Sequence, residues 1–102
     1  MAADADPNTG AAVYDSTRYQ GRSGWFKVGG TSLSAPLIAG VYALAGDGGG
    51  VQYPASLPYG RRAGLNDVTG GSNGNCATIM CSASPGYDGP TGVGTPNGTG
   101  SF

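Results

Sequence analysis

Histidine and glutamate are both absent from this sequence of 102 residues. Without histidine, the chain cannot assemble a Ser-His-Asp catalytic triad or a histidine-based metal site from its own residues. The six acidic residues are all aspartate, so acid–base chemistry within the chain would rest on them, a few tyrosines and Lys27. A serine nucleophile here would therefore need a base supplied from elsewhere.

Charge and long apolar runs are also scarce. Only 11% of the residues are charged, the net charge is −1, and the five cations are scattered along the chain. Because nucleic-acid binding depends on clustered positive charge, we expect no nucleic-acid partner. The longest apolar run, Ala35 to Ala45, is shorter than the roughly 20 residues that a bilayer requires, so we expect no membrane span. Met1 leads directly into a short polar stretch without a signal peptide, so export would need a signal outside these residues.

Glycine and proline are abundant, at 21 and 7 residues. Such a composition is often disordered, but 38% of the residues are hydrophobic, which favours a loop-rich globular piece. A unit of this size buries a modest share of its surface, so we expect it to fold poorly alone. A flexible glycine-rich segment without a fixed fold is the alternative.

The residue pattern predicts few regular elements. Short strands are expected at Ala11–Tyr14 and Trp25–Val28, and a brief extended stretch at Leu65–Thr69. One good helix is expected from Ser32 to about Ala45, with Ser32 or Ser34 as its cap and Gly46 at its end. It is apolar almost all round, which is typical of a helix buried in something larger. A loop follows at 47–50, and turns dominate from Gly70 onward.

The most informative segment runs from Gly29 to Pro36, with the sequence Gly-Gly-Thr-Ser-Leu-Ser-Ala-Pro. It places a hydroxyl, that of Ser32, at the start of the apolar helix. Free backbone N–H groups there can stabilise a developing oxyanion, and the glycines allow a substrate to approach closely. From the residues alone, Ser32 is either a nucleophile awaiting a base or a simple helix cap.

This segment resembles the nucleophile motif of the sedolisins, the serine-carboxyl branch of the subtilisin-like fold. Leu37 follows the proline where true subtilisins carry histidine, which favours the sedolisin branch. The Asp4–Gly10 segment resembles the stretch that leads into the serine strand of the family. The segments Leu65–Gly74 and Pro85–Gly98 resemble its C-terminal end, so the motifs cover nearly the whole chain in family order.

The resemblance implies an α/β fold: residues 1–102 would be the C-terminal portion of a single peptidase domain, truncated on its N-terminal side. That portion would hold short strands, one buried helix after the nucleophile and a glycine-rich calcium loop. Ser32 would be the catalytic nucleophile of a secreted, monomeric serine endopeptidase that acts at acidic pH on peptides or proteins. Its activating Glu and Asp, and an Asp of the oxyanion site, would lie upstream. The alternative is a non-catalytic calcium-stabilised module or pseudoenzyme.

The family also binds one Ca²⁺ through carboxylates and carbonyls delivered by tight turns, the oxygen donors that calcium prefers. Carried onto this sequence, the resemblance implies that the ligands would be the carboxylates of Asp67 and Asp88 and the carbonyls of Val68, Ser84 and Gly86. From the residues alone, two aspartates in turns are more often ordinary turn residues.

The sequence has two further features of interest. Cys76 and Cys81 are the only cysteines, and a local disulfide in an oxidising compartment is favoured over two free thiols. Asn97-Gly98-Thr99 fits the acceptor sequence for N-linked glycosylation, although the abundance of Asn and Gly explains the match by chance adequately.

Overall fold

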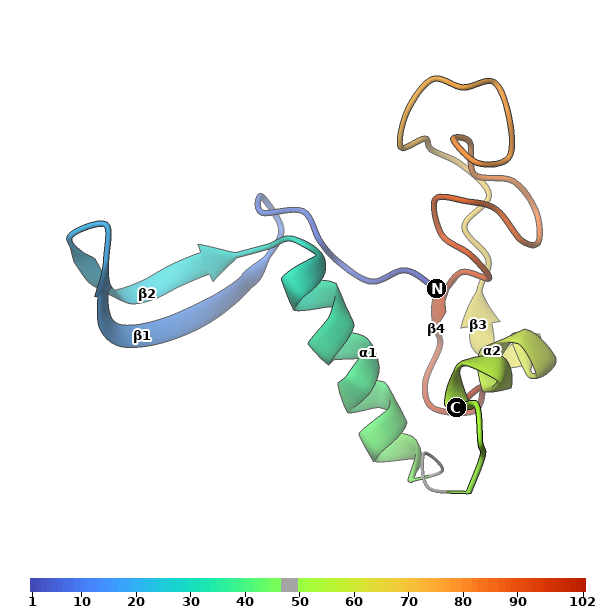
Figure 1. Cartoon of the computed structure of the whole chain (residues 1–102), viewed down its shortest axis with the longest axis horizontal. Helices are drawn as coiled ribbons and strands as arrows, with labels where there is room; N and C mark the ends of the chain where they lie inside the picture. Colours follow the sequence, from blue (N-terminus) through green and yellow to red (C-terminus); the bar gives the residue numbers. More distant parts are fainter. Residues whose placement is uncertain (47–49) are drawn as a thin grey trace.

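An antiparallel hairpin forms the N-terminal part of the fold. In the computed structural model, which describes residues 1–46 and 50–102, β1 (Ala11–Tyr19) pairs with β2 (Arg22–Val28) and Val13 lies opposite Phe26 (Figure 1). Gln20 and Gly21 make the turn with φ values of 50° and 79°, the left-handed conformations that suit a two-residue hairpin loop. The strands predicted at Ala11–Tyr14 and Trp25–Val28 are confirmed within these longer strands.

Helix α1 (Thr31–Ala45) follows the hairpin directly, as predicted. Gly46 ends it in the left-handed conformation, and its N–H donates to the carbonyl of Tyr42 at 3.1 Å. The helix was expected to be buried in something larger than this chain, and within the described residues it is uncovered: no residue of α1 is buried, and Leu44 is 81% exposed. The reason is that the described residues offer too little apolar surface to cover a helix that is apolar on every side. The loop predicted at 47–50 lies, except for Gly50, outside the described residues.

The C-terminal half is built from short elements and turns. Helix α2 (Leu57–Gly60) is flanked by two 3₁₀ turns, η1 (Pro54–Ser56) and η2 (Arg62–Gly64). Strand β3 (Leu65–Asn66) then pairs antiparallel with β4 (Thr95–Pro96), so the extended stretch predicted at Leu65–Thr69 is shorter than expected. Residues 67–94 form a set of loops beyond this small sheet (Figure 1). The prediction of turn upon turn after Gly70 is confirmed.

A small core joins α1 to the C-terminal half. The buried apolar side chains among the described residues are Leu57, Pro58, Val93 and Phe102. The ring of Tyr42 on α1 meets that of Phe102 edge to face, with centroids 4.8 Å apart. The Tyr42 hydroxyl donates to the carbonyl of Pro54 at 2.9 Å, and burial raises the pKa of this phenol.

The molecule is open for its size. Its radius of gyration is 15.9 Å, against about 13 Å for a compact domain of this length. Its accessible surface is 6583 Å², against about 5,200 Å² for a compact monomer of 10.0 kDa. The fold is therefore a small mixed α/β arrangement that leaves much apolar surface uncovered, as a fragment of a larger domain would. Within residues 1–46 and 50–102, no helix has the length and hydrophobicity needed to cross a membrane.

Candidate active site and metal centre

The N-terminal segment packs against the junction between β2 and α1. The Gly30 N–H donates to the carbonyl of Ala5 at 2.6 Å, and the Ser34 hydroxyl donates to the carbonyl of Asp4 at 2.9 Å. A Cβ atom on Gly29 would lie 2.5 Å from the Cα of Pro7, so only glycine allows this approach. The two segments that the sequence singled out, Asp4–Gly10 and Gly29–Gly30, thus lie against each other.

The carboxylates of Asp4 and Asp6 hold the turn in this segment. Asp4 Oδ1 accepts from the Asp6 N–H at 3.0 Å and from the Thr9 hydroxyl at 3.1 Å. Asp6 Oδ1 accepts from the Asn8 N–H at 2.8 Å. Both carboxylates are therefore engaged locally, in the manner of aspartates that shape a turn.

Ser32 is the second residue of α1, and its side chain is exposed. The N–H groups of Leu33 and Ser34 both donate to the Gly30 carbonyl, at 2.9 and 3.4 Å. The N–H groups of Thr31 and Ser32 have no acceptor in the part of the chain that the structure describes. A hydroxyl therefore stands beside two free backbone donors at the positive end of a helix dipole.

The expectation that Ser32 or Ser34 caps the helix is wrong. The capping residue is Gly30, with φ 87° and ψ 170°, and no side chain makes a capping hydrogen bond. Ser34 lies too far into the helix and bonds the N-terminal segment instead, donating to the carbonyls of Asp4 and, at 3.3 Å, Ala3. The Ser32 side chain makes no hydrogen bond to any described residue, so the cap explanation for this serine fails.

Among the residues that the structure describes, Asp88 is the most enclosed aspartate, with none of its surface exposed. Its Oδ2 accepts from the Ser84 N–H at 2.9 Å, and its Oδ1 accepts from the N–H and the hydroxyl of Thr91 at 2.8 and 2.9 Å. The backbone N–H groups of Ser84 and Thr91 lower the pKa of Asp88, outweighing the opposing effect of its burial. Asp88 is therefore held as a buried anion.

Asp67 also bonds this loop. Its Oδ2 accepts from the Gly86 N–H at 2.8 Å, and both residues line a cavity of about 120 Å³. The two aspartates thus bond backbone groups only two residues apart, Ser84 and Gly86. The carbonyls of Val68, Ser84 and Gly86 accept no hydrogen bond from the described residues. No group of three or more acidic, cysteine or histidine side chains lies close enough among residues 1–46 and 50–102 to hold a metal. A metal here would need those carbonyls.

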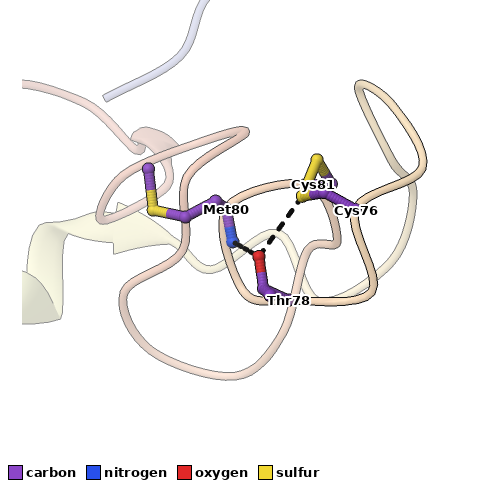
Figure 2. The surroundings of a disulfide bond; sticks show 4 residues. All are labelled: Cys76, Thr78, Met80 and Cys81. Carbon is purple, nitrogen blue, oxygen red and sulfur yellow. Dashed lines mark hydrogen bonds between the residues drawn. A yellow bond between two sulfur atoms is a disulfide. The ribbon is translucent and has the colours of Figure 1, made fainter.

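Cys76 and Cys81 form a disulfide, as predicted, with their Cα atoms 5.7 Å apart (Figure 2). Figure 2 also shows Thr78 inside the closed loop, where its hydroxyl oxygen accepts from the Met80 N–H and lies 3.2 Å from the Cys76 sulfur. The Asn73 N–H donates to the Cys81 carbonyl at 3.0 Å, and the Gly89 N–H donates to the Ile79 carbonyl at 2.7 Å. The disulfide loop is therefore bonded to the residue that follows Asp88.

Thr91 is the contact residue that the sequence reasoning missed. Its two hydrogen bonds to Asp88 close a turn at Asp88-Gly89-Pro90-Thr91. An aspartate followed three residues later by a threonine, with glycine and proline between them, is a turn signal that would have identified it.

Three fungal peptidases are among the known proteins similar to this chain. Aorsin from Aspergillus oryzae is 40% identical over 75 residues, and tripeptidyl-peptidase SED1 from Arthroderma otae is 42% identical over 78 residues. The related tripeptidyl-peptidase of Aspergillus fumigatus is 37% identical over 76 residues. These matches cover 68–70% of this chain but only 12% of each relative's length. No protein-family profile matches the chain. No solved structure matches it either.

Acid should destabilise the loop around Asp88. Because the folded pKa of Asp88 lies below its ordinary value, its contribution to stability is present above about pH 4 and is lost as the pH falls through the folded pKa. In the 102-residue chain, we expect the protection of the Ser84 and Thr91 amides, which is the intrinsic exchange rate at each pH divided by the observed rate, to fall between pH 6 and pH 3. Asp88→Asn should remove this pH dependence by exposing the same amides already at pH 6. The exposed Asp15→Asn variant is the control, and equal exchange in both variants would contradict the assignment.

Removing the disulfide should loosen the adjoining loop. The closed loop is short, so the chain-entropy model gives a loss of about 2 kcal/mol at most for Cys76→Ser/Cys81→Ser. The loss should appear as faster exchange at the Asn73 and Gly89 amides, which bond the carbonyls of Cys81 and Ile79. Amides of the β1–β2 hairpin serve as the internal reference and should not change. Unaltered exchange at Asn73 would show that the bridge does not hold this loop.

Proposed function

The chain belongs to the sedolisin family of serine-carboxyl peptidases, and from this premise we propose that it is the C-terminal part of a serine endopeptidase domain with a subtilisin-like fold, with Ser32 as the nucleophile. One observation carries the assignment of Ser32. Its hydroxyl is exposed at the start of α1, with no hydrogen bond to a described residue, beside two backbone N–H groups that lack acceptors. A serine that capped the helix would instead accept a hydrogen bond from the N–H two or three residues after it, and Ser32 makes no such bond.

The proposed chemistry is peptide-bond hydrolysis through an acyl-enzyme. Ser32 Oγ attacks the carbonyl carbon of the peptide bond, and its proton passes to a carboxylate base. The C–N bond then breaks, the leaving amine takes up a proton, and an acyl-enzyme ester remains on Ser32 until water hydrolyses it. The helix-start N–H groups lie where they could help to stabilise the oxyanion. The base is a Glu supported by an Asp, and both, together with an oxyanion Asp, come from residues upstream of this chain.

The rest of the same peptidase domain is the partner that this chain requires. The matched stretch is 12% of each relative's length, and the apolar helix α1 has no buried residue. An apolar surface of this kind is stable in water only when another part of the protein covers it. The remaining domain would cover α1 and deliver the carboxylates to Ser32, and the complete protein would act as a monomer.

One Ca²⁺ ion completes the domain in this proposal. The carboxylates of Asp67 and Asp88 and the carbonyls of Val68, Ser84 and Gly86 would hold it. This donor set consists entirely of oxygen atoms from carboxylates and carbonyls, which is what calcium requires. The carbonyls are free of hydrogen bonds to described residues, and both carboxylates reach the 84–88 loop, so the residues fit the ion. The ion is structural and takes no part in the reaction.

The complete protein would be exported and active at acidic pH. The Cys76–Cys81 disulfide supports export, because such bonds persist in oxidising compartments. Carboxylate chemistry supports an acidic optimum, since a carboxylate base works best near its own pKa. The alternative is a calcium-stabilised module without catalysis. Measuring peptide hydrolysis by the complete protein would distinguish the peptidase from this module.

Peptide hydrolysis should depend on Ser32 and on the upstream residues together. The 102-residue chain alone should show no turnover between pH 3 and pH 7, because it holds neither histidine nor glutamate to activate the serine. In the complete protein, Ser32→Ala should abolish turnover, whereas Ser23→Ala, at an exposed serine of β2, should leave it unchanged.

Two substrates are needed for this assay. One is a peptide blocked at both ends, which only an endopeptidase cleaves. The other has a free amino terminus and a reporter after its third residue, because two of the relatives are named tripeptidyl-peptidases. Sustained cleavage by the 102-residue chain that disappears in Ser32→Ala would refute the need for upstream carboxylates. Full activity of the complete Ser32→Ala protein would refute the nucleophile.

Calcium should stabilise the complete protein through Asp67 and Asp88. A chelator should lower its melting temperature, because the ion binds the folded state and holds two carboxylates that otherwise repel. Asp67→Asn should make the melting temperature insensitive to the chelator, while Asp15→Asn should retain the full shift. A chelator shift in Asp67→Asn as large as that of the parent sequence would rule out this site.

A further inference from the structure

The turn after β4 carries a feature that the peptidase assignment does not use. Asn97-Gly98-Thr99 is the one place in the sequence where an asparagine is followed, two residues later, by serine or threonine with no proline between. All three residues are exposed, and a Cβ atom built on Gly98 or Gly100 would have no neighbour within 4 Å. The sequon therefore lies in open space, on the kind of surface loop that N-linked glycans occupy.

Hydrogen bonds and buried residues fix the backbone on both sides of this turn. Before it, the Asn97 N–H donates to the Gly64 carbonyl at 3.1 Å. After it, Ser101 and Phe102 are buried, and the Ser101 hydroxyl donates to the Arg61 carbonyl. Arg61 Nη1 donates in turn to the Phe102 carbonyl at 3.0 Å. The backbone on each side is thus fixed while the sequon between the anchors projects outward.

The side-chain amide of Asn97 is also free to react. The amide of Asn8 donates to Asp6 Oδ1 at 2.9 Å, and that of Asn66 donates to the Pro96 carbonyl at 3.4 Å. Asn97 makes no side-chain hydrogen bond to any residue in 1–46 or 50–102, and neither does the Thr99 hydroxyl. Asn97 thus combines the sequon, exposure and an unengaged Nδ2 atom.

We infer that Asn97 is an N-glycosylation site. The donor is an oligosaccharide linked through a diphosphate to a membrane lipid, and a transferase of the export pathway catalyses the transfer. The Asn97 Nδ2 atom forms the bond to the anomeric carbon, and the bond from that carbon to the diphosphate oxygen breaks. The electron pair leaves with the lipid diphosphate, and a base of the transferase takes the amide proton.

The position of the site keeps the glycan away from the candidate centres. Figure 1 shows the 67–94 loops beyond one end of the β3–β4 sheet and the C-terminal turn beyond the other. A glycan on Asn97 would therefore extend from the end of the sheet opposite the calcium loop. It would add a hydrated cover to a chain with unusually exposed apolar surface, without obstructing that loop.

The test is expression of the full 102-residue chain behind a secretion signal in yeast, with analysis of both the medium and the cell lysate, because transfer precedes secretion. A peptide amidase that cleaves glycosylasparagine should lower the mass of the chain and convert Asn97 to aspartate, which peptide mass spectrometry detects. Asn97→Gln and Thr99→Ala should each remove the mass difference. Thr99→Ser keeps the sequon and should retain it, and Asn73→Gln changes an exposed asparagine outside the sequon and should also retain it.

Unmodified Asn97 in both fractions would overturn the proposal, as would a glycan that persists in Thr99→Ala. Because the measurement needs no catalysis, either result would leave the peptidase assignment of Ser32 untouched. Conversely, an inactive complete protein with a glycan on Asn97 would refute the peptidase assignment alone.

Discussion

The arrangement of the two halves of the chain depends on the 2.6 Å hydrogen bond from the Gly30 amide to the Ala5 carbonyl. It holds the first residues of the chain against the junction where β2 becomes α1. Three residues earlier, the Ala2 N–H donates to the Gly94 carbonyl at 3.0 Å, so the same segment also reaches the C-terminal loops (Figure 1). Residues 1–10 therefore link the half that carries Ser32 to the half that carries Asp67 and Asp88.

The C-terminal half is organised around carboxylates more than around a hydrophobic core. Its buried apolar side chains are Leu57, Pro58, Val93 and Phe102, whereas the buried Asp88 alone accepts three hydrogen bonds. A core of this size supplies little stability, and small folds commonly compensate with disulfides or metals. The disulfide in this half and the proposed ion would serve that purpose. An ion bound at Asp67 and Asp88 would also neutralise the charge that backbone N–H groups and the Thr91 hydroxyl now stabilise.

Local sequence signals predicted the elements but not their long-range contacts. The helix and its end at Gly46 followed from an apolar run bounded by glycine, and the disulfide followed from two cysteines in an export-compatible sequence. The strands proved longer because Gln20-Gly21 adopts a hairpin turn without the usual Asn-Gly signature. The cap was mispredicted because Ser34 bonds a segment thirty residues earlier, which no local rule detects. The carbonyl ligands expected at Val68, Ser84 and Gly86 depend on which way each backbone carbonyl points. No local sequence pattern predicts this, so the expectation came only from the family resemblance.

The exposure of Trp25 on the hairpin has a practical consequence. Trp25 is the single tryptophan of the chain, it is 72% exposed on β2, and its ring lies 5.5 Å from that of Tyr14 across the strand pair. Indole emission shifts to shorter wavelength when water is replaced by protein around it. The fluorescence spectrum of this one side chain therefore reports whether anything covers the hairpin, without a label. Titrating the isolated chain with the separately expressed upstream region would turn the assembly of the two pieces into an optical signal.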